Sequence, residues 1–198
     1  MNLPNKITLS RIVIVFIILI LANIYYMFSP TISYTIQIIG AVLAVIAALT
    51  DMFDGYIARK LNMVSNFGKL IDPLADKIFV MTIFIIFASK ISPYTHMPLI
   101  PSWIVVIVLA REFLVTGLRS LAATKGEVIA ADKYGKIKTA SQMVLFAFGG
   151  LLWLEILPLV GAIFYIWIAA IMIVALITVF SGLNYFVKYK HLYLNDVD

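Results

Sequence analysis

Four aspartates stand close together in a chain that is otherwise strongly apolar. Asp51 and Asp54 are three residues apart, and Asp72 and Asp76 are four apart. On an α-helix, both spacings place the two side chains of a pair on one face. The chain has only ten acidic residues in all, so their concentration here indicates a site built from carboxylates.

Carboxylates that are held together repel one another, and each is costly near hydrocarbon. Protonation would relieve the repulsion, and so would one or two divalent cations bound between the carboxylates. The chain has no cysteine and two histidines, His96 and His191, in distant and unlike contexts. Any metal would therefore have oxygen ligands, which favour hard ions such as Mg2+ or Mn2+. The basic residues around the cluster suit a ligand that carries phosphates.

A simpler interpretation stays open for each aspartate taken alone. Asp51 and Asp54 can solvate a helix end, and Asp72 before Pro73 is typical of an N-cap followed by proline in the first turn. A helix start requires neither Asp76 nor the glycine after Asp54. The joint arrangement favours a metal site, with the two pairs facing each other from antiparallel helices that the intervening segment connects.

The elements that must position these aspartates are membrane helices. The chain is 63% hydrophobic and 13% charged, whereas a soluble domain has about a quarter charged residues. Mean hydropathy is +1.05. Irregular backbone cannot face lipid, so helices are expected. The apolar runs predict six transmembrane helices, over Ile12–Phe28, Ile32–Thr50, Ile78–Ser89, Met97–Ala110 with its continuation Phe113–Leu118, Thr139–Leu154 and Ile156–Val187.

A spanning helix needs about 20 residues, and the third and fourth runs are shorter than that. Both must extend through charged residues, and this extension puts five of them at or inside the membrane boundary: Asp72, Asp76, Lys77, Arg111 and Glu112. Pro158 and Gly161 mark the entry of the sixth helix. The predicted fold is an all-α, integral membrane bundle that forms a single domain over residues 1–198.

The orientation follows from the positive charges. With the N-terminus in the cytoplasm, every lysine and arginine except Lys90 falls on the cytoplasmic side. The aspartates and both termini then face the cytoplasm, and Arg119–Lys138 is one cytoplasmic loop. Basic residues before an apolar run, here Lys6 and Arg11, are also typical of signal peptides, but this run is long and no clear cleavage pattern follows it. We expect a retained helix in the cell membrane.

The motif D-x2-D-G-x2-A-R-x8-G-x3-D-x3-D, which runs from Asp51 to Asp76, resembles the full signature of the CDP-alcohol phosphotransferases. These integral membrane enzymes transfer a substituted phosphate from a CDP-linked donor to an alcohol and release CMP. The resemblance implies that Asp51, Asp54, Asp72 and Asp76 hold one or two divalent ions, Mg2+ or Mn2+. Asp76 would also be the general base. The residues implied in binding the CDP-lipid are Asn5, Thr8, Asp51, Gly55, Ala58, Arg59 and Gly68.

Three further segments resemble one branch of the family, the phosphatidylglycerophosphate synthases: NLPNKITLSR, REFLVTGLRSLAA and GKIKTASQ. That branch joins CDP-diacylglycerol to sn-glycerol 3-phosphate. The resemblance implies that the acceptor phosphate is bound by Arg111, Arg119, Lys136 and Lys138. A structural alternative stays open for Arg119, which shares a helix face with Glu112 and could form an ion pair within the protein. Adjacent helical residues such as Arg111 and Glu112 are expected to diverge. Lys125 and Lys133 are expected to stay solvated near anionic headgroups.

Two other functions remain to be separated from this one. A related enzyme would use serine, inositol or another alcohol as acceptor. A divalent-cation transporter would also carry membrane carboxylates, but at several depths, whereas all four aspartates lie at one cytoplasmic edge. We expect CDP-diacylglycerol, sn-glycerol 3-phosphate and the lipid bilayer as partners, a homodimer by resemblance, and no nucleic acid.

Overall fold

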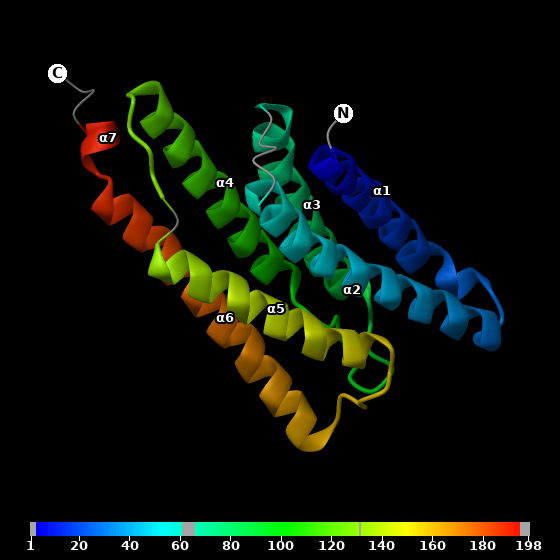
Figure 1. Cartoon of the computed structure of the whole chain (residues 1–198). Helices are drawn as coiled ribbons and strands as arrows, with labels where there is room; N and C mark the ends of the chain where they lie inside the picture. The colour runs from blue at the N-terminus through cyan, green and yellow to red at the C-terminus, as the bar shows by residue number, and fades with distance from the viewer. Residues whose placement is uncertain (1–2, 61–65, 131, 195–198) are drawn as a thin grey trace. The chain divides into compact units, whose positions relative to one another are not determined.

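The computed structural model describes residues 3–60, 66–130 and 132–194, and its regular elements are helices (Figure 1). The side chains of residues 3–4, 51–60, 66–67, 69–70 and 72 lie outside the described residues. Within the described ranges, extended pairing is limited to an isolated bridge between Ile91 and Pro98. The elements are α1 (Leu3–Ile24), the 3-10 helix η1 (Tyr25–Met27), α2 (Pro30–Lys60), α3 (Asn66–Ser89), α4 (Ser102–Thr124), α5 (Lys133–Trp153), α6 (Gly161–Lys188) and α7 (His191–Leu194). The prediction of an all-α fold is confirmed.

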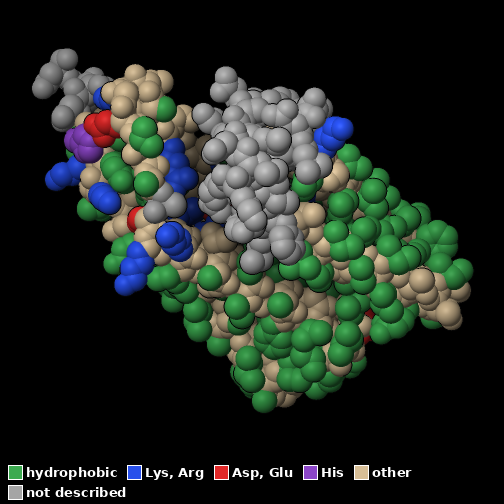
Figure 2. All heavy atoms as spheres, in the orientation of Figure 1, with side chains coloured by type: hydrophobic (Ala, Val, Ile, Leu, Met, Phe, Trp, Pro, Cys, Tyr) green, Lys and Arg blue, Asp and Glu red, His purple; other side chains and the backbone are tan. Residues whose placement is uncertain are grey.

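Apolar surface identifies a multi-pass membrane protein. In the described part of the chain, three helical segments are long and apolar enough to cross a membrane: Asn5–Met27, Pro30–Thr50 and Gly161–Lys188. Large apolar side chains on α5 and α6 are exposed, such as Val144 at 71% and Leu176 at 66%. Figure 2 shows hydrophobic side chains over most of the visible part of these helices, with Lys and Arg gathered near the C-terminal end of α6. Lipid is the environment that suits such a surface.

The chain forms two compact units, residues 1–86 and 87–198. In the first, α1 packs along α2, and the buried side chains of Val15, Ile18 and Ala47 contribute to the core. Helix α2 continues past Thr50, the end of its apolar run, to Lys60, as the helical spacing of Asp51 and Asp54 indicated. The segment from Asp51 to Arg59 therefore has helical backbone, which the apolar run alone did not predict because charged residues mark its boundary.

Helix α3 begins well before the apolar run that starts at Ile78, so the prediction that this helix extends through its charges is confirmed. Pro73 lies inside the helix rather than in its first turn. The interpretation of Asp72 as an N-cap is therefore wrong. A proline in a helix interior removes one backbone hydrogen bond, and here the helix continues on both sides of it. Residues 61–65, which connect α2 to α3, lie outside the described residues.

In the second unit, α4 continues through Arg111 and Glu112, as predicted, but it begins at Ser102 rather than Met97. Pro98 and Pro101 explain the later start, since proline is tolerated only in the first turn of a helix. The prediction that Arg119–Lys138 forms one loop is wrong. Helix α4 runs to Thr124 and α5 starts at Lys133. Helix α6 starts at Gly161, with φ at +52°, which confirms that residue as the entry.

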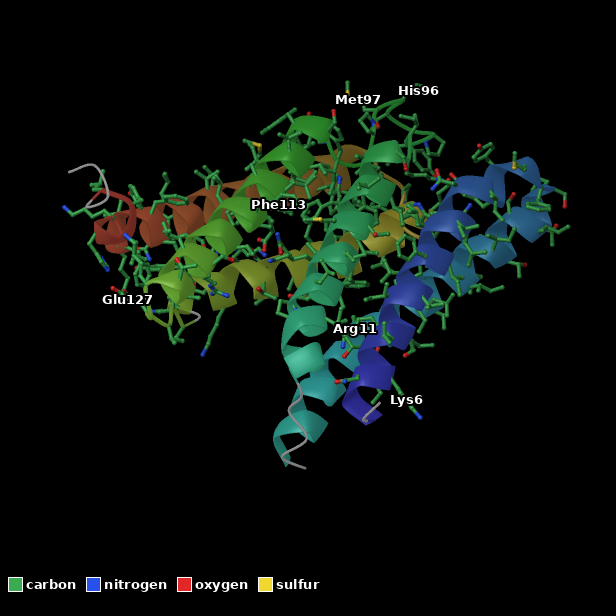
Figure 3. All side chains as sticks on the ribbon, turned by 90° about the horizontal axis from the view of Figure 1, so that it is seen from above. Lys6, Arg11, His96, Met97, Phe113 and Glu127 are labelled. Carbon is green, nitrogen blue, oxygen red and sulfur yellow. The ribbon has the colours of Figure 1, made fainter. Side chains whose placement is uncertain are left out.

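The core of the second unit contains Trp167, whose Nε1 donates a 2.6 Å hydrogen bond to the carbonyl oxygen of Leu99. Its ring makes edge contacts with Phe87 and Phe148. Figure 3 places Met97 and Glu127 at opposite ends of α4, with Phe113 between them. At the Met97 end, Lys90 Nζ forms a 2.8 Å ion pair with Glu155 Oε1.

Candidate functional site

A buried ion cluster joins α4, α5 and α6. Glu112 Oε1 lies 3.0 Å from Arg111 Nη1 and 2.6 Å from Lys138 Nζ. These three side chains are only 7 to 12% exposed. The expectation that Arg111 and Glu112 diverge is wrong, because their long side chains bend together where an unpaired charge would be costly. Glu112 thus connects cations from two helices.

Arg111 also reaches α6, where its Nη2 donates a 2.6 Å hydrogen bond to Ser181 Oγ. Gly182 lets the helix approach, since a Cβ added there would lie 3.0 Å from Arg111 Cγ. A guanidinium carries five N–H donors. The Nε of Arg111 is buried and has no hydrogen-bond partner among the described residues. The cluster therefore holds Arg111 firmly and leaves one of its donors unused.

Tyr185 on α6 positions the second arginine of α4. Its hydroxyl accepts a 2.9 Å hydrogen bond from Arg119 Nη2. The Cζ atoms of Arg119 and Arg111 lie 5.5 Å and 5.8 Å from the centre of its ring, within cation–π distance. Among the described residues, Arg119 forms no ion pair with Glu112, although the two share a helix face.

Asp132 fixes the start of α5 beside this tyrosine. Its Oδ1 accepts a 2.7 Å hydrogen bond from the backbone N–H of Gly135, which caps the helix. Its Oδ2 accepts a 3.0 Å bond from Asn184 Nδ2, and its own backbone N–H donates to the hydroxyl of Tyr185 at 3.1 Å. These bonds tie the first turn of α5, and so Lys138 farther along it, to α6.

The two predicted acceptor lysines differ. Lys138 is buried in the ion cluster. Lys136 is exposed, and its side chain makes no hydrogen bond or ion pair with the described residues. Residues two apart on a helix do not face the same way. Lys133 is exposed as expected, whereas Lys125 Nζ donates to the carbonyl oxygen of Leu192 at 2.7 Å and is not simply solvated.

Sequence reasoning missed Tyr185, Ser181 and Asn184. The available signal was their polarity at the end of the apolar run that forms α6. Asp132 was also missed, although an aspartate at the start of a helix is a recognisable N-cap. The structure thus brings Arg111, Arg119 and Lys138 together through residues that come from the far end of the chain.

The aspartates lie on α2 and α3 of the first unit. The backbone of α2 is helical as far as Lys60, and that of α3 is helical from Asn66, so each aspartate pair has the spacing that places it on one helix face. The side chain of Asp76 is exposed, and Gly68 is buried. Carboxylate oxygens suit a hard divalent ion. The predicted site residues whose side chains lie outside the described residues are Asp51, Asp54, Gly55, Ala58, Arg59 and Asp72.

The start of α1 has a buried polar face. Asn5, Thr8 and Arg11 follow one another at intervals of three and are 6%, 1% and 1% exposed. Lys6, labelled with Arg11 in Figure 3, is exposed. Because Asn5 and Thr8 precede the first apolar run, they would ordinarily be interpreted as interface or capping residues, and their burial argues against the interface. Arg11 was considered only for topology, although its spacing from Thr8 marks the same face.

Comparison with known proteins covers both units. The family model described as CDP-alcohol phosphatidyltransferase matches residues 1–181. The chain is 43% identical over 192 residues to the CDP-diacylglycerol–glycerol-3-phosphate 3-phosphatidyltransferase of Bacillus subtilis (strain 168), covering 94% of each chain. It is 36% identical over 192 residues to the protein of the same name from Rickettsia typhi, covering 93% of this chain and 95% of that one. A third, from Mycoplasma pneumoniae, is 37% identical over 154 residues, 72% of this chain and 65% of that one.

Proposed function

The chain belongs to the CDP-alcohol phosphatidyltransferase family, and we propose that it transfers the phosphatidyl group of CDP-diacylglycerol to sn-glycerol 3-phosphate. The products are phosphatidylglycerophosphate and CMP. In this reaction an acceptor hydroxyl oxygen forms a bond to the lipid-bearing phosphorus, the bond from that phosphorus to CMP breaks, and the hydroxyl proton passes to a base. The names of the three relatives support this acceptor.

The proposed acceptor rests mainly on the charges of the ion cluster and of the neighbouring Arg119. Arg111 and Lys138 contact the carboxylate of Glu112, while Arg119 contacts the hydroxyl of Tyr185. These side chains bring three cations and one carboxylate to one place, and a phosphate monoester of about −1.5 to −2 would suit such a group of charges. Serine and inositol carry no phosphate and would make no such use of the cations. Arg111 Nε offers a further donor to the phosphate, and Lys136 adds positive charge from the surface.

The donor site is assigned to the first unit. Asp51, Asp54, Asp72 and Asp76 would hold Mg2+ or Mn2+, as one or two ions. When bound, the metal neutralises the diphosphate and stabilises CMP as the leaving group. Asp76, whose side chain is exposed, takes the proton of the acceptor hydroxyl. The small residues Gly55, Ala58 and Gly68 admit the nucleotide, while Arg59, Asn5 and Thr8 contact it.

The membrane arrangement that fits this chemistry has six transmembrane helices, α1 to α6, in the cell membrane. Both termini and the active site face the cytoplasm, where the water-soluble acceptor is available. The lysine and arginine distribution supports this orientation. The continuity of α3 and α4 through their charged residues supports six spans. The enzyme is proposed to be a homodimer, which chemical crosslinking in membranes would test.

The acceptor is tested with purified protein in detergent. CDP-diacylglycerol is supplied with labelled sn-glycerol 3-phosphate, serine or inositol, and both the lipid product and CMP are measured. We expect product only with sn-glycerol 3-phosphate. Product with serine but none with sn-glycerol 3-phosphate would reject the proposed acceptor. Divalent-ion flux into proteoliposomes, without CMP release from any acceptor, would favour the transporter.

The role of Asp76 is tested by Asp76→Asn. Loss of a general base typically lowers the rate by about 100-fold to 10,000-fold, while binding of CDP-diacylglycerol should persist. Glu127→Gln is the control, because Glu127 is exposed and lies on the loop between α4 and α5. Turnover by Asp76→Asn at the wild-type rate would exclude Asp76 as the base. Chelation by EDTA should stop turnover, and Mg2+ or Mn2+ should restore it.

A further inference from the structure

Gln142 on α5 is a buried amide with no hydrogen-bond partner among the described residues. Its side chain is 0% exposed, and neither Oε1 nor Nε2 has a hydrogen-bond partner among the described residues. Leaving a buried donor or acceptor unpaired costs about 1–3 kcal/mol. The large majority of buried polar atoms in proteins are paired. A group of this kind needs a partner that the described residues do not supply.

The position of Gln142 connects it with the ion cluster. It follows Lys138 by four residues, so the two side chains lie on one face of α5, one turn apart. Lys138 contacts Glu112, which in turn contacts Arg111. In the described part of the second unit, the buried side-chain nitrogen and oxygen atoms without partners belong only to Arg111 and Gln142. The unused hydrogen-bonding capacity therefore gathers beside the proposed phosphate site.

The chemistry of an amide matches that of an alcohol. Oε1 accepts a hydrogen bond, and Nε2 donates one, while a hydroxyl does both. The proposed acceptor has a phosphate and two hydroxyls. If the terminal hydroxyl attacks phosphorus, the hydroxyl on C2 must also leave water, which is unfavourable without a new partner. One helix turn is about 5.4 Å, a span that a three-carbon phosphate can bridge.

We propose that Gln142 binds the C2 hydroxyl of sn-glycerol 3-phosphate through both atoms of its amide. Gln142 is then a specificity-determining residue, which selects this acceptor over phosphorylated alcohols that lack the hydroxyl. The inference rests on the proposed function, because it assumes that the ion cluster holds the acceptor phosphate. In this proposal, Gln142 recognises the hydroxyl of the acceptor and the ion cluster recognises its phosphate.

The test compares two acceptors, sn-glycerol 3-phosphate and 3-hydroxypropyl phosphate, which lacks the C2 hydroxyl. We expect kcat/KM of the wild-type enzyme to favour sn-glycerol 3-phosphate by about 100-fold or more, since a site that hydrogen-bonds a hydroxyl rejects an analogue without it. In Gln142→Leu, the preference should fall to about threefold or less. The loss should come from sn-glycerol 3-phosphate, with activity on the analogue kept, because leucine leaves no polar group unpaired.

Thermal stability and a control variant distinguish a role of Gln142 in acceptor recognition from a role in folding. Replacing an unpaired buried amide with an apolar side chain should leave the thermal midpoint in detergent unchanged or raise it. Gln142→Met, which is unbranched and fills irregular space, repeats the measurement if the leucine does not fit. Gln37→Leu removes a buried glutamine on α2 and should leave the acceptor preference unchanged.

Two results would overturn the proposal: a wild-type enzyme that does not distinguish the acceptors, or a parallel loss with both acceptors in both Gln142 variants. The second result would make Gln142 a structural residue and leave the proposed function intact. A wild-type enzyme that does not use sn-glycerol 3-phosphate at all would instead contradict the proposed function, and this inference with it.

Discussion

The hydroxyl of Tyr185 accepts a 2.9 Å hydrogen bond from Arg119, and the ring of the same tyrosine lies beside the guanidinium of Arg111. One side chain of α6 therefore orients two cations of α4. The tyrosine is itself 1% exposed and receives a bond from the backbone N–H of Asp132. If the arginines bind the acceptor phosphate as proposed, their fixed positions lower the entropic cost of that binding.

Tyr185→Phe should weaken acceptor binding. It removes the hydroxyl that accepts from Arg119 while keeping the ring. A hydrogen bond to a charged group contributes about 1.5–3 kcal/mol, so we expect KM for sn-glycerol 3-phosphate to rise about tenfold or more. KM for CDP-diacylglycerol should change little. Tyr189→Phe is the matched control, because Tyr189 stacks on Tyr185 and its hydroxyl makes no hydrogen bond with the described residues. Equal effects from the two variants would reject the positioning role.

Lys138→Ala should affect the acceptor more than Lys136→Ala. Lys138 is buried against Glu112, and removing one partner of a buried charge pair costs about 2–5 kcal/mol. We expect KM for sn-glycerol 3-phosphate to rise about 30-fold or more. Lys136 is exposed, where solvent screens its charge, so Lys136→Ala should change KM by about threefold or less. A larger effect at Lys136 would place the phosphate nearer the surface than proposed.

The helices could largely be predicted from the sequence, and the contacts between them could not. Membrane thickness required the third and fourth helices to extend through Asp76 and Arg111, and the structure has them do so. The apolar run of α2 stops at Thr50, but the spacing of Asp51 and Asp54 indicated helix beyond it, and α2 continues to Lys60. Local periodicity cannot distinguish a helix that stops at the membrane surface from one that continues into water.

In the candidate site, too, single residues could be predicted from the sequence, whereas the contacts between helices could not. The arginines and lysines proposed to bind the acceptor were singled out by motif, but the residue that holds Arg119 is Tyr185, which lies on a different helix. No spacing within a single helix contains that information. Asp132 was within reach of sequence reasoning as an N-cap, yet its bond to Asn184 depends on how α5 packs against α6. Long-range polar contacts of this kind need the tertiary structure.

Gly149→Ala should destabilise the second unit. A Cβ at this position would lie 2.8 Å from Trp167 Cη2 and would also clash with the ring of Phe87. Both rings belong to a packed core and have little room to move, so overpacking should cost about 1–3 kcal/mol. Gly150→Ala is the control, since a Cβ there meets nothing within 4 Å. Thermal unfolding in detergent measures both variants, and a midpoint for Gly149→Ala at or above that of Gly150→Ala would contradict the packing at Trp167.

The natural absence of cysteine makes the orientation of the second unit directly measurable. Met97 and Val128 are 60% and 96% exposed and lie in the loops before and after α4. If α4 crosses the membrane with Lys90 on the outer side, Met97→Cys should react with a membrane-impermeant maleimide in spheroplasts of the expressing cells. Val128→Cys should react only after the membrane is permeabilised, because a charged reagent cannot cross the hydrocarbon. The cysteine-free parent gives the background. The reverse labelling pattern would put the ion cluster on the outer side, where a cytoplasmic acceptor could not reach it, and would reject the proposed topology.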